Sequence, residues 1–271
     1  MNCEKYFTTA KIFLEKPAMI FAITKPAPVP PLSARPRKLR VTAIDNWLRD
    51  PYSLYARYIL NLRKLDEIDR EPDASDFGNL VHKALEIFTR DFYKVCHSHE
   101  GGNLKSKIPA NLSNQGWAGM TELLEAGRVA FADFIDRPAV ACLWWPRFVA
   151  MANWLVNEEK IRRDYIESVH SEVSASWSFE VDGKSFTLST RIDRLERLKS
   201  GSYALIDYKT GTIPSKNDRE NGFSNQLPLE SLIVQNGQLP EGISSGAVSQ
   251  MEYWKLSGNE VKCEITLVKI D

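Results

Sequence analysis

The period of the hydrophobic residues changes once along this chain, and this change constrains the fold more than any other feature. In the first half, apolar residues recur three or four positions apart, as in "DFGNLVHKALEIF", which is the spacing of one helix face. From Val173 onward they alternate with polar residues, as in "VSASWSFEV", which is typical of strands. Helices first and strands afterwards predict a mixed α/β domain in which helices cover a central sheet.

Helical signals dominate the first half and recur once in the second. Thr42 is expected to cap a first helix and Pro51 to open another, because these residue types are favoured at helix starts. The apolar periods then predict helices over residues 77–95, 117–136, 144–168 and 226–234.

Turn signals divide the second half into strands. Asp182-Gly183 is a two-residue hairpin signal, and "KSG" is expected to form the next turn. The segment "SGN" is expected to turn a final hairpin. The predicted strands are residues 173–181, 185–198, 202–210, 248–256 and 261–270.

Prolines and basic residues mark the start of the chain. Residues 17–38 hold six of the 14 prolines, and a segment with few amide donors and no apolar period is typical of an extended linker. We therefore expect a flexible linker over residues 1–40 and a folded domain over residues 41–271. A basic cluster at the end of the linker is interpreted as a solvated tether or, alternatively, as a phosphate contact: Arg35, Arg37, Lys38 and Arg40.

Composition restricts the partners and the compartment. Of 271 residues, 43% are hydrophobic, and the 35 basic and 35 acidic residues give zero net charge, so any nucleic acid must be held by a local patch. The four scattered cysteines fit a reducing compartment. Charged residues and Pro17 interrupt the apolar residues 11–24, so we expect a cytoplasmic protein without a membrane partner.

The stretch "ALIDYKTGT" places Asp207 and Lys209 at the end of a strand that is otherwise apolar. Residues i and i+2 of a strand share a face about 6.5 to 7 Å apart, so these two side chains point the same way and Tyr208 points back. A plain salt bridge at the strand end is one interpretation, and a polar site is the other.

The preceding strand supplies a second carboxylate. If residues 199–201 form a three-residue loop, Leu198 pairs with Ser202, and counting along the ladder sets Asp193 directly opposite Asp207. A four-residue loop would shift this register by one. Directly opposed side chains have Cβ atoms roughly 4.5 to 5.5 Å apart, where like charges repel. A bound divalent cation such as Mg²⁺, which prefers oxygen ligands, would compensate for the repulsion.

A histidine on the strongest helix is a third candidate. His82 lies on the shoulder of the apolar stripe, with Gly78 and Glu86 one turn to either side. The missing side chain at Gly78 leaves room beside the imidazole. A packing role is the alternative for His82, and the nearby acidic pair favours a role in a site.

These residues resemble, in kind and in order, the nuclease domain of the RecB family within the PD-(D/E)xK superfamily. The matching segments, each weak alone and specific in combination, are "GNLVH" (Gly78, His82), "RIDRLE" (Asp193), "DYKTG" (Asp207, Lys209, Thr210) and "QLPLES" (Gln226). The resemblance implies a restriction-endonuclease-like core, with a central mixed sheet flanked by helices and a helical N-terminal half.

The closer resemblance is to the C-terminal nuclease domain of AddB-type proteins, over roughly residues 36–258. Some of these domains carry an iron-sulfur cluster whose first cysteine precedes the entry proline. Asp50 stands in that place here, before Pro51, so no iron-sulfur cluster is expected. AddB proteins also have a long helicase-like region before this domain and more chain after it. The chain is therefore interpreted as a fragment, a trimmed version or a split gene product.

The resemblance implies metal-dependent hydrolysis of DNA. Asp193, Asp207 and the backbone carbonyl of Tyr208 would hold Mg²⁺, with Mn²⁺ as the alternative ion and His82 near or on the metal. The cation would polarise the phosphate and make hydroxide available. Lys209 would orient the attacking water and offset charge on the phosphoryl oxygens.

Three further residues have both a site role and a simpler interpretation. Gln226 would lie near the metal or contact DNA, or only begin a helix. Glu172, which is expected to precede the first strand, could reach the metal through water or remain solvated. Thr210 could touch a phosphate or cap its turn.

The sequence thus predicts an exonuclease-type Mg²⁺-dependent deoxyribonuclease in double-strand-break repair and recombination. Its implied partners are DNA, a helicase of AddA type and the helicase-like part of AddB. The alternative from another class is a non-hydrolytic module that binds a DNA end or docks a helicase.

Overall fold

The computed structural model describes residues 27–65, 70–97, 118–258 and 262–269. The chain divides into two compact units, Met1–Arg35 and Pro36–Asp271. The described part of the first unit holds one short 3-10 helix, η1 (Leu32–Ala34). The sheet, its covering helices and the candidate site all belong to the second unit.

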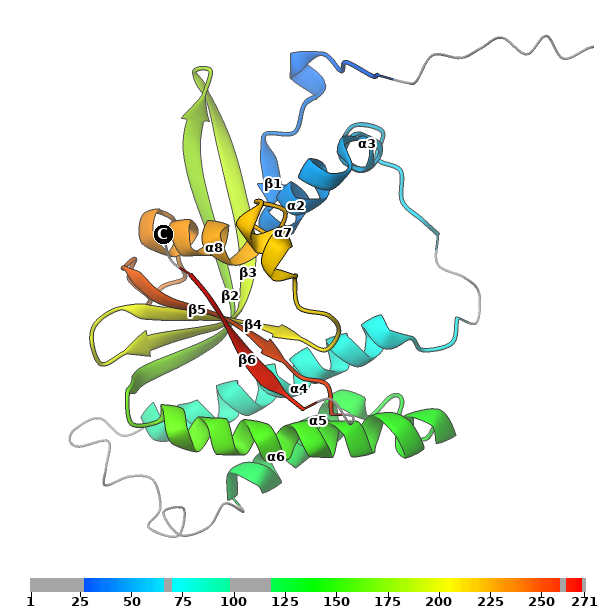
Figure 1. Ribbon diagram of the computed structural model, residues 1–271, viewed down its shortest axis with the longest axis vertical. Helices are drawn as coiled ribbons and strands as arrows, with labels where there is room; N and C mark the ends of the chain where they lie inside the picture. The colour runs from blue at the N-terminus through cyan, green and yellow to red at the C-terminus, as the bar shows by residue number, and fades with distance from the viewer. Residues whose placement is uncertain (1–26, 66–69, 98–117, 259–261, 270–271) are drawn as a thin grey trace, which may run out of the picture. The chain divides into compact units, whose positions relative to one another are not determined.

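A six-stranded mixed sheet organises the second unit (Figure 1). Its order is β1-β3-β4-β5-β6, and β2 pairs with β3 along most of the length of both strands. Pairs β1–β3 and β4–β5 are parallel, and β2–β3, β3–β4 and β5–β6 are antiparallel. The strands are β1 (Lys38–Arg40), β2 (Ile166–Val181), β3 (Lys184–Leu198), β4 (Tyr203–Lys209), β5 (Val248–Lys255) and β6 (Glu264–Val268).

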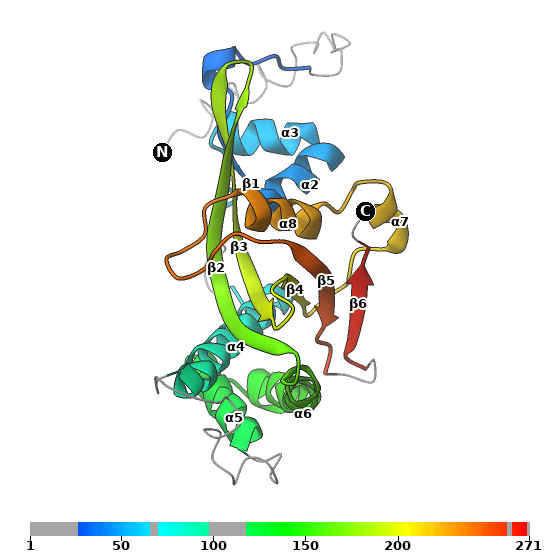
Figure 2. The ribbon, with the colours of Figure 1, turned by 90° about the vertical axis from the view of Figure 1, so that its left-hand side faces the viewer.

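Helices cover both faces of this sheet (Figure 2). The apolar residues of α4, α5 and α6 form one core on one face, and those of β1, α2 and α8 form a second core on the other. The helices are α2 (Val41–Arg49), α3 (Pro51–Leu54), α4 (Ala74–His97), α5 (Ala118–Phe131), α6 (Trp145–Arg162), α7 (Lys216–Glu220) and α8 (Gln226–Asn236), with π-helical turns η2 (Tyr55–Ile59) and η5 (Val140–Trp144). The predicted mixed α/β class, with a helical first half and a flanked sheet, is confirmed.

The alternation of β4 decides which face receives the polar residues at its end. Ile206 and Tyr208 belong to the core under α4 to α6, whereas Leu205 belongs to the core under α2 and α8. Asp207 and Lys209 therefore share the α8 side, because side chains alternate along a strand. The expectation that Tyr208 points away from this pair is confirmed.

Two of the three predicted turns are present as expected. Val181 pairs with Lys184 across Asp182-Gly183. The backbone N–H of Leu198 donates to the carbonyl of Ser202 at 2.8 Å, which closes the three-residue loop. Its last residue, Gly201, has a φ of +87°, a left-handed conformation that glycine adopts readily. The three-residue interpretation of this loop is confirmed.

The predicted boundary between the last first-half helix and the first strand is wrong. The helix α6 ends at Arg162, not at residue 168, and β2 begins at Ile166, not at residue 173. Ile166 and Val169 pack with Leu198 and Ala204, so pairing with the far end of β3 recruits them into the sheet.

Three other local predictions differ from the structure. Thr42 does not cap a helix, because α2 begins at Val41, directly after β1, with Arg40 at its N-cap. Residues 38–40, predicted as linker, form β1, and buried Leu39 fixes this strand in the core. The final hairpin pairs Lys255 with Glu264, so its connection is longer than the predicted "SGN" turn.

Between α6 and the sheet lies a buried network of two arginines and three glutamates. Arg162 binds Glu196 and Glu252, and Arg194 binds Glu159 and Glu196. Arg194 also donates to the Tyr208 hydroxyl at 3.4 Å. The side chain of Tyr208 is thereby anchored on the face opposite Asp207.

Among the helices in the described part of the chain, none is long and apolar enough to cross a membrane.

Candidate active site

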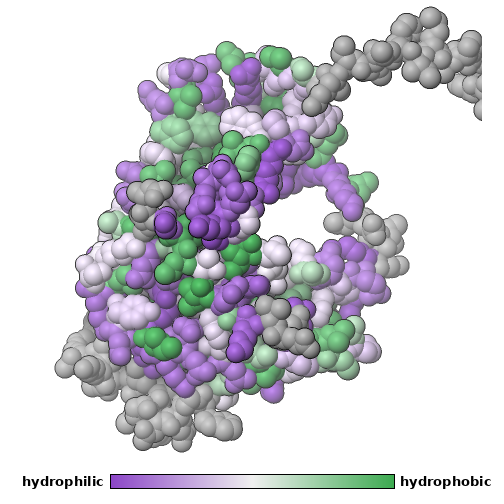
Figure 3. Space-filling model, in the orientation of Figure 1, coloured by the Kyte–Doolittle hydropathy of each residue, from purple (hydrophilic) through white to green (hydrophobic). Residues whose placement is uncertain are grey.

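A cleft of about 820 Å³ lies where the end of β4 meets α4, the middle of the β2–β3 hairpin and the start of α8. The face of the molecule in Figure 3 is hollowed between the part that carries α2 and the part that carries α4, and its visible rim is mostly hydrophilic. The cleft brings together all seven side chains singled out in the sequence and the backbone of Tyr208: His82, Glu172, Asp193, Asp207, Tyr208, Lys209, Thr210 and Gln226.

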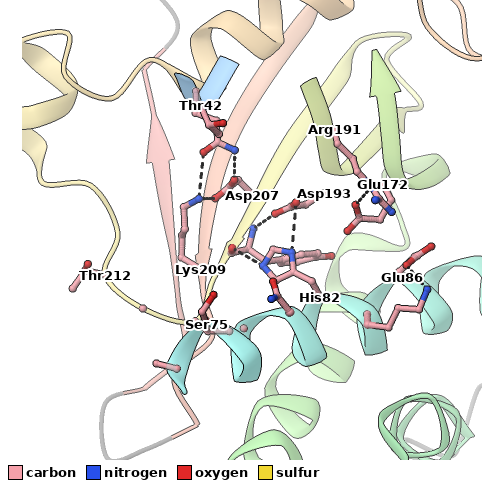
Figure 4. A pocket seen from close by; sticks show the side chains of 18 of the residues that line it. Thr42, Ser75, His82, Glu86, Glu172, Arg191, Asp193, Asp207, Lys209 and Thr212 are labelled. Carbon is pink, nitrogen blue, oxygen red and sulfur yellow. Dashed lines mark hydrogen bonds and ion pairs between the residues drawn. The ribbon is translucent and has the colours of Figure 1, made fainter. Parts of the chain in front are cut away.

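Asp193 and His82 (Figure 4) form one half of this site together with the backbone of Tyr208. Asp193 accepts a hydrogen bond from the Tyr208 N–H through Oδ2 at 2.9 Å, and its Oδ1 lies 3.5 Å from His82 Nδ1. The other ring nitrogen, Nε2, lies 3.1 Å from the Tyr208 carbonyl oxygen. Burial lowers the pKa of His82, but the hydrogen bond and charge of Asp193 and the charge of Asp207 outweigh it, so this pKa is raised.

Asp207, Lys209 and Gln226 form the other half. Asp207 is 2% exposed, and its Oδ1 accepts a hydrogen bond from Gln226 Nε2 at 2.5 Å. Its Oδ2 lies 2.6 Å from Lys209 Nζ, an ion pair, but accepts no hydrogen bond of normal geometry from any described residue. Lys209 Nζ donates to Gln226 Oε1 at 3.3 Å. Burial raises the pKa of Asp207 to about 6, against the opposing charge of Lys209.

The expected opposition of Asp193 and Asp207 is nearly reached in the ladder. Its last pair is Arg194 with Ile206, and one more step in the same register would set the two aspartates opposite each other. Their carboxylates turn to different partners instead, Asp193 toward His82 and Asp207 toward Lys209. The simple salt bridge and the polar site, two interpretations of the Asp-x-Lys pattern, are therefore both present.

Glu172 lies inside β2, not before it as predicted. Its φ of +53° is a left-handed conformation, uncommon for a residue with a side chain. Arg191 Nε lies 2.5 Å from its Oε2. Burial and the charge of Asp193 raise the pKa of Glu172. Ligand atoms of His82, Glu172 and Asp193 all lie within 4.8 Å of one another.

The alternation of β3 is interrupted at Asp193. Ile192 and Leu195 are three positions apart, yet both belong to the core under α2 and α8. In an unbroken strand, residues an odd number apart point to opposite faces. The strand therefore turns about Asp193, and the long hairpin is visibly curved (Figure 2). The apolar pair three apart in "RIDRLERL" is the sequence signal of this break.

Gly78 allows α4 to approach the end of β4. A Cβ atom at this position would lie 2.9 Å from Thr210 Oγ1, closer than real Cβ contacts allow. The space left by the missing side chain of Gly78 is thus used by the Thr210 side chain.

The donor set fits a divalent cation that prefers oxygen. It offers the carboxylates of Asp193, Asp207 and Glu172, the Tyr208 carbonyl and the His82 imidazole in one cleft. Hard cations such as Mg²⁺ and Mn²⁺ take carboxylate and carbonyl oxygens. The buried Asp207 Oδ2 is paired with Lys209 Nζ but accepts no hydrogen bond of normal geometry from the described residues, so it retains a lone pair for a cation.

Sequence reasoning missed Arg191, which lines the cleft and pairs with Glu172, and it missed Glu230. Glu230 is 2% exposed and accepts hydrogen bonds from Thr190 Oγ1 at 2.7 Å and from Gln226 Nε2 at 3.4 Å. The spacing from Gln226 to Glu230 puts both on one helix face, and this spacing could have indicated the contact.

Comparison with known proteins identifies a family that matches most of this chain. Residues 39–268 match the family described as the PD-(D/E)XK nuclease superfamily. A Clostridium perfringens (strain SM101) protein, named as one of the subunits of an ATP-dependent helicase/deoxyribonuclease, is 26% identical over 209 residues, which are 72% of this chain and 17% of that protein.

Two uncharacterized Rickettsia proteins are more similar. One from Rickettsia typhi is 31% identical over 231 residues, covering 84% of this chain and 25% of that protein. One from Rickettsia conorii is 32% identical over 203 residues, which cover 74% of this chain and 22% of that protein. The chain therefore spans about a quarter or less of the length of these relatives.

Proposed function

Because this chain belongs to the PD-(D/E)XK nuclease superfamily, we propose that it is a deoxyribonuclease that hydrolyses phosphodiester bonds with the help of a divalent cation, as an exonuclease. One observation carries the proposal. The buried Asp207, beside Lys209, meets Asp193 and His82 from separate elements in one cleft.

Mg²⁺ is the proposed ion, with Mn²⁺ as its alternative. Asp193, Asp207, the Tyr208 carbonyl and His82 would hold it, and Glu172 would reach it through water. When bound, such a cation polarises a phosphoryl oxygen and lowers the pKa of bound water toward neutrality. Arg191, paired with Glu172 at 2.5 Å, balances the charge of that carboxylate.

In the proposed reaction, water adds to phosphorus, one P–O ester bond breaks, and the departing oxygen takes up a proton. Lys209 would orient the attacking water and stabilise negative charge on the phosphoryl oxygens, because an ammonium group fixed near developing charge favours the transition state. Gln226 contacts both Lys209 and Asp207 and would hold this pair. Thr210, on the wall of the cleft, would donate a hydrogen bond from its hydroxyl to a phosphate oxygen.

The wider role is proposed from the relatives. The helicase/deoxyribonuclease name of the Clostridium protein supports a place in a helicase-nuclease of AddAB type. The partners would be DNA, an AddA-type helicase and a helicase-like region of AddB type. Such an assembly would act in double-strand-break repair and recombination.

The direct test is cleavage of linear DNA with and without Mg²⁺. Wild type should degrade it in the presence of the ion, and Asp207→Ala should lose at least about 100-fold in rate. Asp182→Asn, at the exposed β2–β3 turn, is the control and should retain activity. If wild type cleaves no DNA with Mg²⁺ or Mn²⁺, hydrolysis is wrong for this chain, and a non-hydrolytic module that binds DNA ends or docks a helicase becomes the better account.

Metal binding can be tested without catalysis. Calorimetric titration with Mn²⁺ should show binding to wild type that Asp193→Asn and Asp207→Asn each weaken. Equal affinity in all three proteins would remove these aspartates from the proposed ligand set.

A further inference from the structure

Behind the Asp207–Lys209 pair, a chain of hydrogen bonds runs back into the core. Gln226 contacts both members of the pair. Its Nε2 also donates to Glu230 Oε1 at 3.4 Å, and the same oxygen accepts from Thr190 Oγ1 at 2.7 Å. The chain therefore links β3, α8 and the end of β4.

The contacts determine which way the Gln226 amide faces. An amide has two N–H donors on nitrogen and a pure acceptor on oxygen. Here the nitrogen faces carboxyl oxygens of Asp207 and Glu230 that accept hydrogen bonds, and the oxygen faces the ammonium group of Lys209. A rotation of the amide by 180° would set its oxygen against both of these acceptor oxygens and its nitrogen against a cation. All three neighbours thus favour one orientation.

Glu230 occupies a buried position where burial of an apolar side chain would cost less free energy. Its neighbours along α8 that are fully buried are Leu227, Ile233 and Val234, all 0% exposed. Burial of a carboxyl group costs free energy unless hydrogen bonds compensate. Glu230 receives two such bonds, one of which comes from Gln226, the residue that contacts Asp207 and Lys209.

We propose that Glu230 is a positioning residue that fixes the Gln226 amide and thereby the placement of Asp207 and Lys209. Its effect on catalysis rests on the proposed nuclease function, whereas its effect on the Gln226 amide does not. Thr190 completes the arrangement, because its hydroxyl, which comes from β3, donates to the same Glu230 oxygen that Gln226 contacts.

The kinetic test compares two replacements of similar size. Glu230→Met removes the acceptor and should lower kcat about 10- to 100-fold, because small displacements of reacting groups cost this much. Glu230→Gln retains a carbonyl acceptor and should recover most of the rate. The KM for DNA should stay within about twofold for both. Ser231→Ala, also buried on α8 but bonded to Gln235, is the matched control and should behave as wild type.

A double-mutant cycle separates positioning from mere packing. If Glu230 acts through Gln226, adding Glu230→Met to Gln226→Ala should lower kcat by no more than about twofold further. Independent losses that multiply in the double variant would overturn the proposal. Failure of Glu230→Gln to exceed Glu230→Met in rate would overturn it as well.

An NMR measurement tests the contact without catalysis. In protein labelled with ¹⁵N-glutamine, the Gln226 side-chain amide is identified by its absence from Gln226→Ala. Its two protons should be protected from exchange in wild type and Glu230→Gln, and should lose protection in Glu230→Met. Unchanged protection in Glu230→Met would refute the positioning role. If wild type cleaves no DNA but the amide pattern holds, the proposed function fails while the placement of Gln226 by Glu230 stands.

Discussion

A glycine that a helix would ordinarily avoid shows how closely the site is packed. Glycine within a helix is less favourable than alanine by roughly 0.5–1 kcal/mol. Gly78 lies within α4, and an alanine Cβ there would meet Thr210 Oγ1 at 2.9 Å. The glycine therefore serves the contact between α4 and the end of β4, at a cost to the helix.

Gly78→Ala should consequently fail to stabilise the protein, because the helix gain is offset by displacement of Thr210. In a Thr210→Ala background, which removes the clashing oxygen, the same change should raise the free energy of unfolding by roughly 0.5–1 kcal/mol. Urea unfolding of the four proteins measures both effects. Equal effects of Gly78→Ala in the two backgrounds would show that Thr210 is not the constraint.

Glu230 should make stability depend on pH. Burial, followed by the charge of Asp207, raises its pKa from 4.5 to about 8, although hydrogen bonds from Thr190 and Gln226 oppose the shift. The folded state therefore binds this proton more tightly than the unfolded state. The resulting stabilisation is complete below about pH 4.5 and is lost as the pH rises through about 8.

Glu230→Gln has no such proton to lose, so it should gain stability relative to wild type between pH 5 and pH 9. The gain should be on the order of 2–4 kcal/mol. Chemical unfolding in EDTA at several pH values measures it, with exposed Glu180→Gln as the control. If the free energies of unfolding of wild type and Glu230→Gln differed by the same amount at every pH, a raised pKa at Glu230 would be contradicted.

The residues of the site were predictable to different degrees. Asp207, Lys209 and Asp193 could be found because strand periodicity and a turn with a definite residue count relate them in space. The break of alternation at Asp193 was not part of that count, although the apolar pair Ile192 and Leu195, three positions apart, is a signal of it. Glu230 was missed because a glutamate on a helix is ordinarily solvated, and only tertiary packing buries it.

At the scale of elements, α2 fixes the start of α8 and hence the position of Gln226. Asp45 Oδ1 accepts hydrogen bonds from the backbone N–H of Asn225 at 2.8 Å and from its side-chain amide at 3.0 Å. Asn225 is the N-cap residue of α8, and Gln226 is the first residue of that helix. A carboxylate that lies 180 residues from Asn225 in the sequence thus holds the helix end that contacts Asp207.

Asp45→Ala should therefore affect both stability and activity. Loss of a charged acceptor for two hydrogen bonds should lower the free energy of unfolding by about 1–3 kcal/mol. The rate of DNA cleavage should fall several-fold, with little change in KM, because the start of α8 is less well held. Asn46→Ala, on the exposed side of the same helix, is the control for both measurements. If Asp45→Ala behaved like this control, the contact would not position α8.

Sequence patterns predict the boundaries of elements less well than their existence and type. The amphipathic period correctly indicated α4 and α8, since long regular patterns report local structure. It overran the end of α6, because the spacing of Ile166 and Val169 also fits a helix face, although β-branched residues favour strands. Their pairing with the end of β3, about thirty residues away, decides the outcome.

At the scale of the whole molecule, the order of helices and strands was enough to predict a mixed α/β domain whose sheet is covered by helices. The strand order was not predictable in the same way. The parallel pairings of β1 with β3 and of β4 with β5 join segments that are distant in sequence. No local turn signal specifies such pairings, because parallel strands need long crossover connections.

The strand β1 provides a test of where the folded unit begins. The compact unit starts at Pro36, and β1 pairs Lys38–Arg40 with Thr187 to Ser189 of β3. Leu39 is 3% exposed within the core under α2 and α8. A chain that lacks residues 1–35 retains this strand, whereas one that lacks residues 1–40 does not.

The second truncation should be less stable than the first by about 2–4 kcal/mol, because it exposes the core around Leu39 and leaves the edge of β3 unpaired. Thermal and urea unfolding of both proteins measure the difference. Leu39→Ala in the full chain should reproduce a large part of it, since it removes the same buried side chain without shortening the chain. Equal stability of the two truncated proteins would mean that residues 36–40 belong to the linker, and that the folded unit begins at α2.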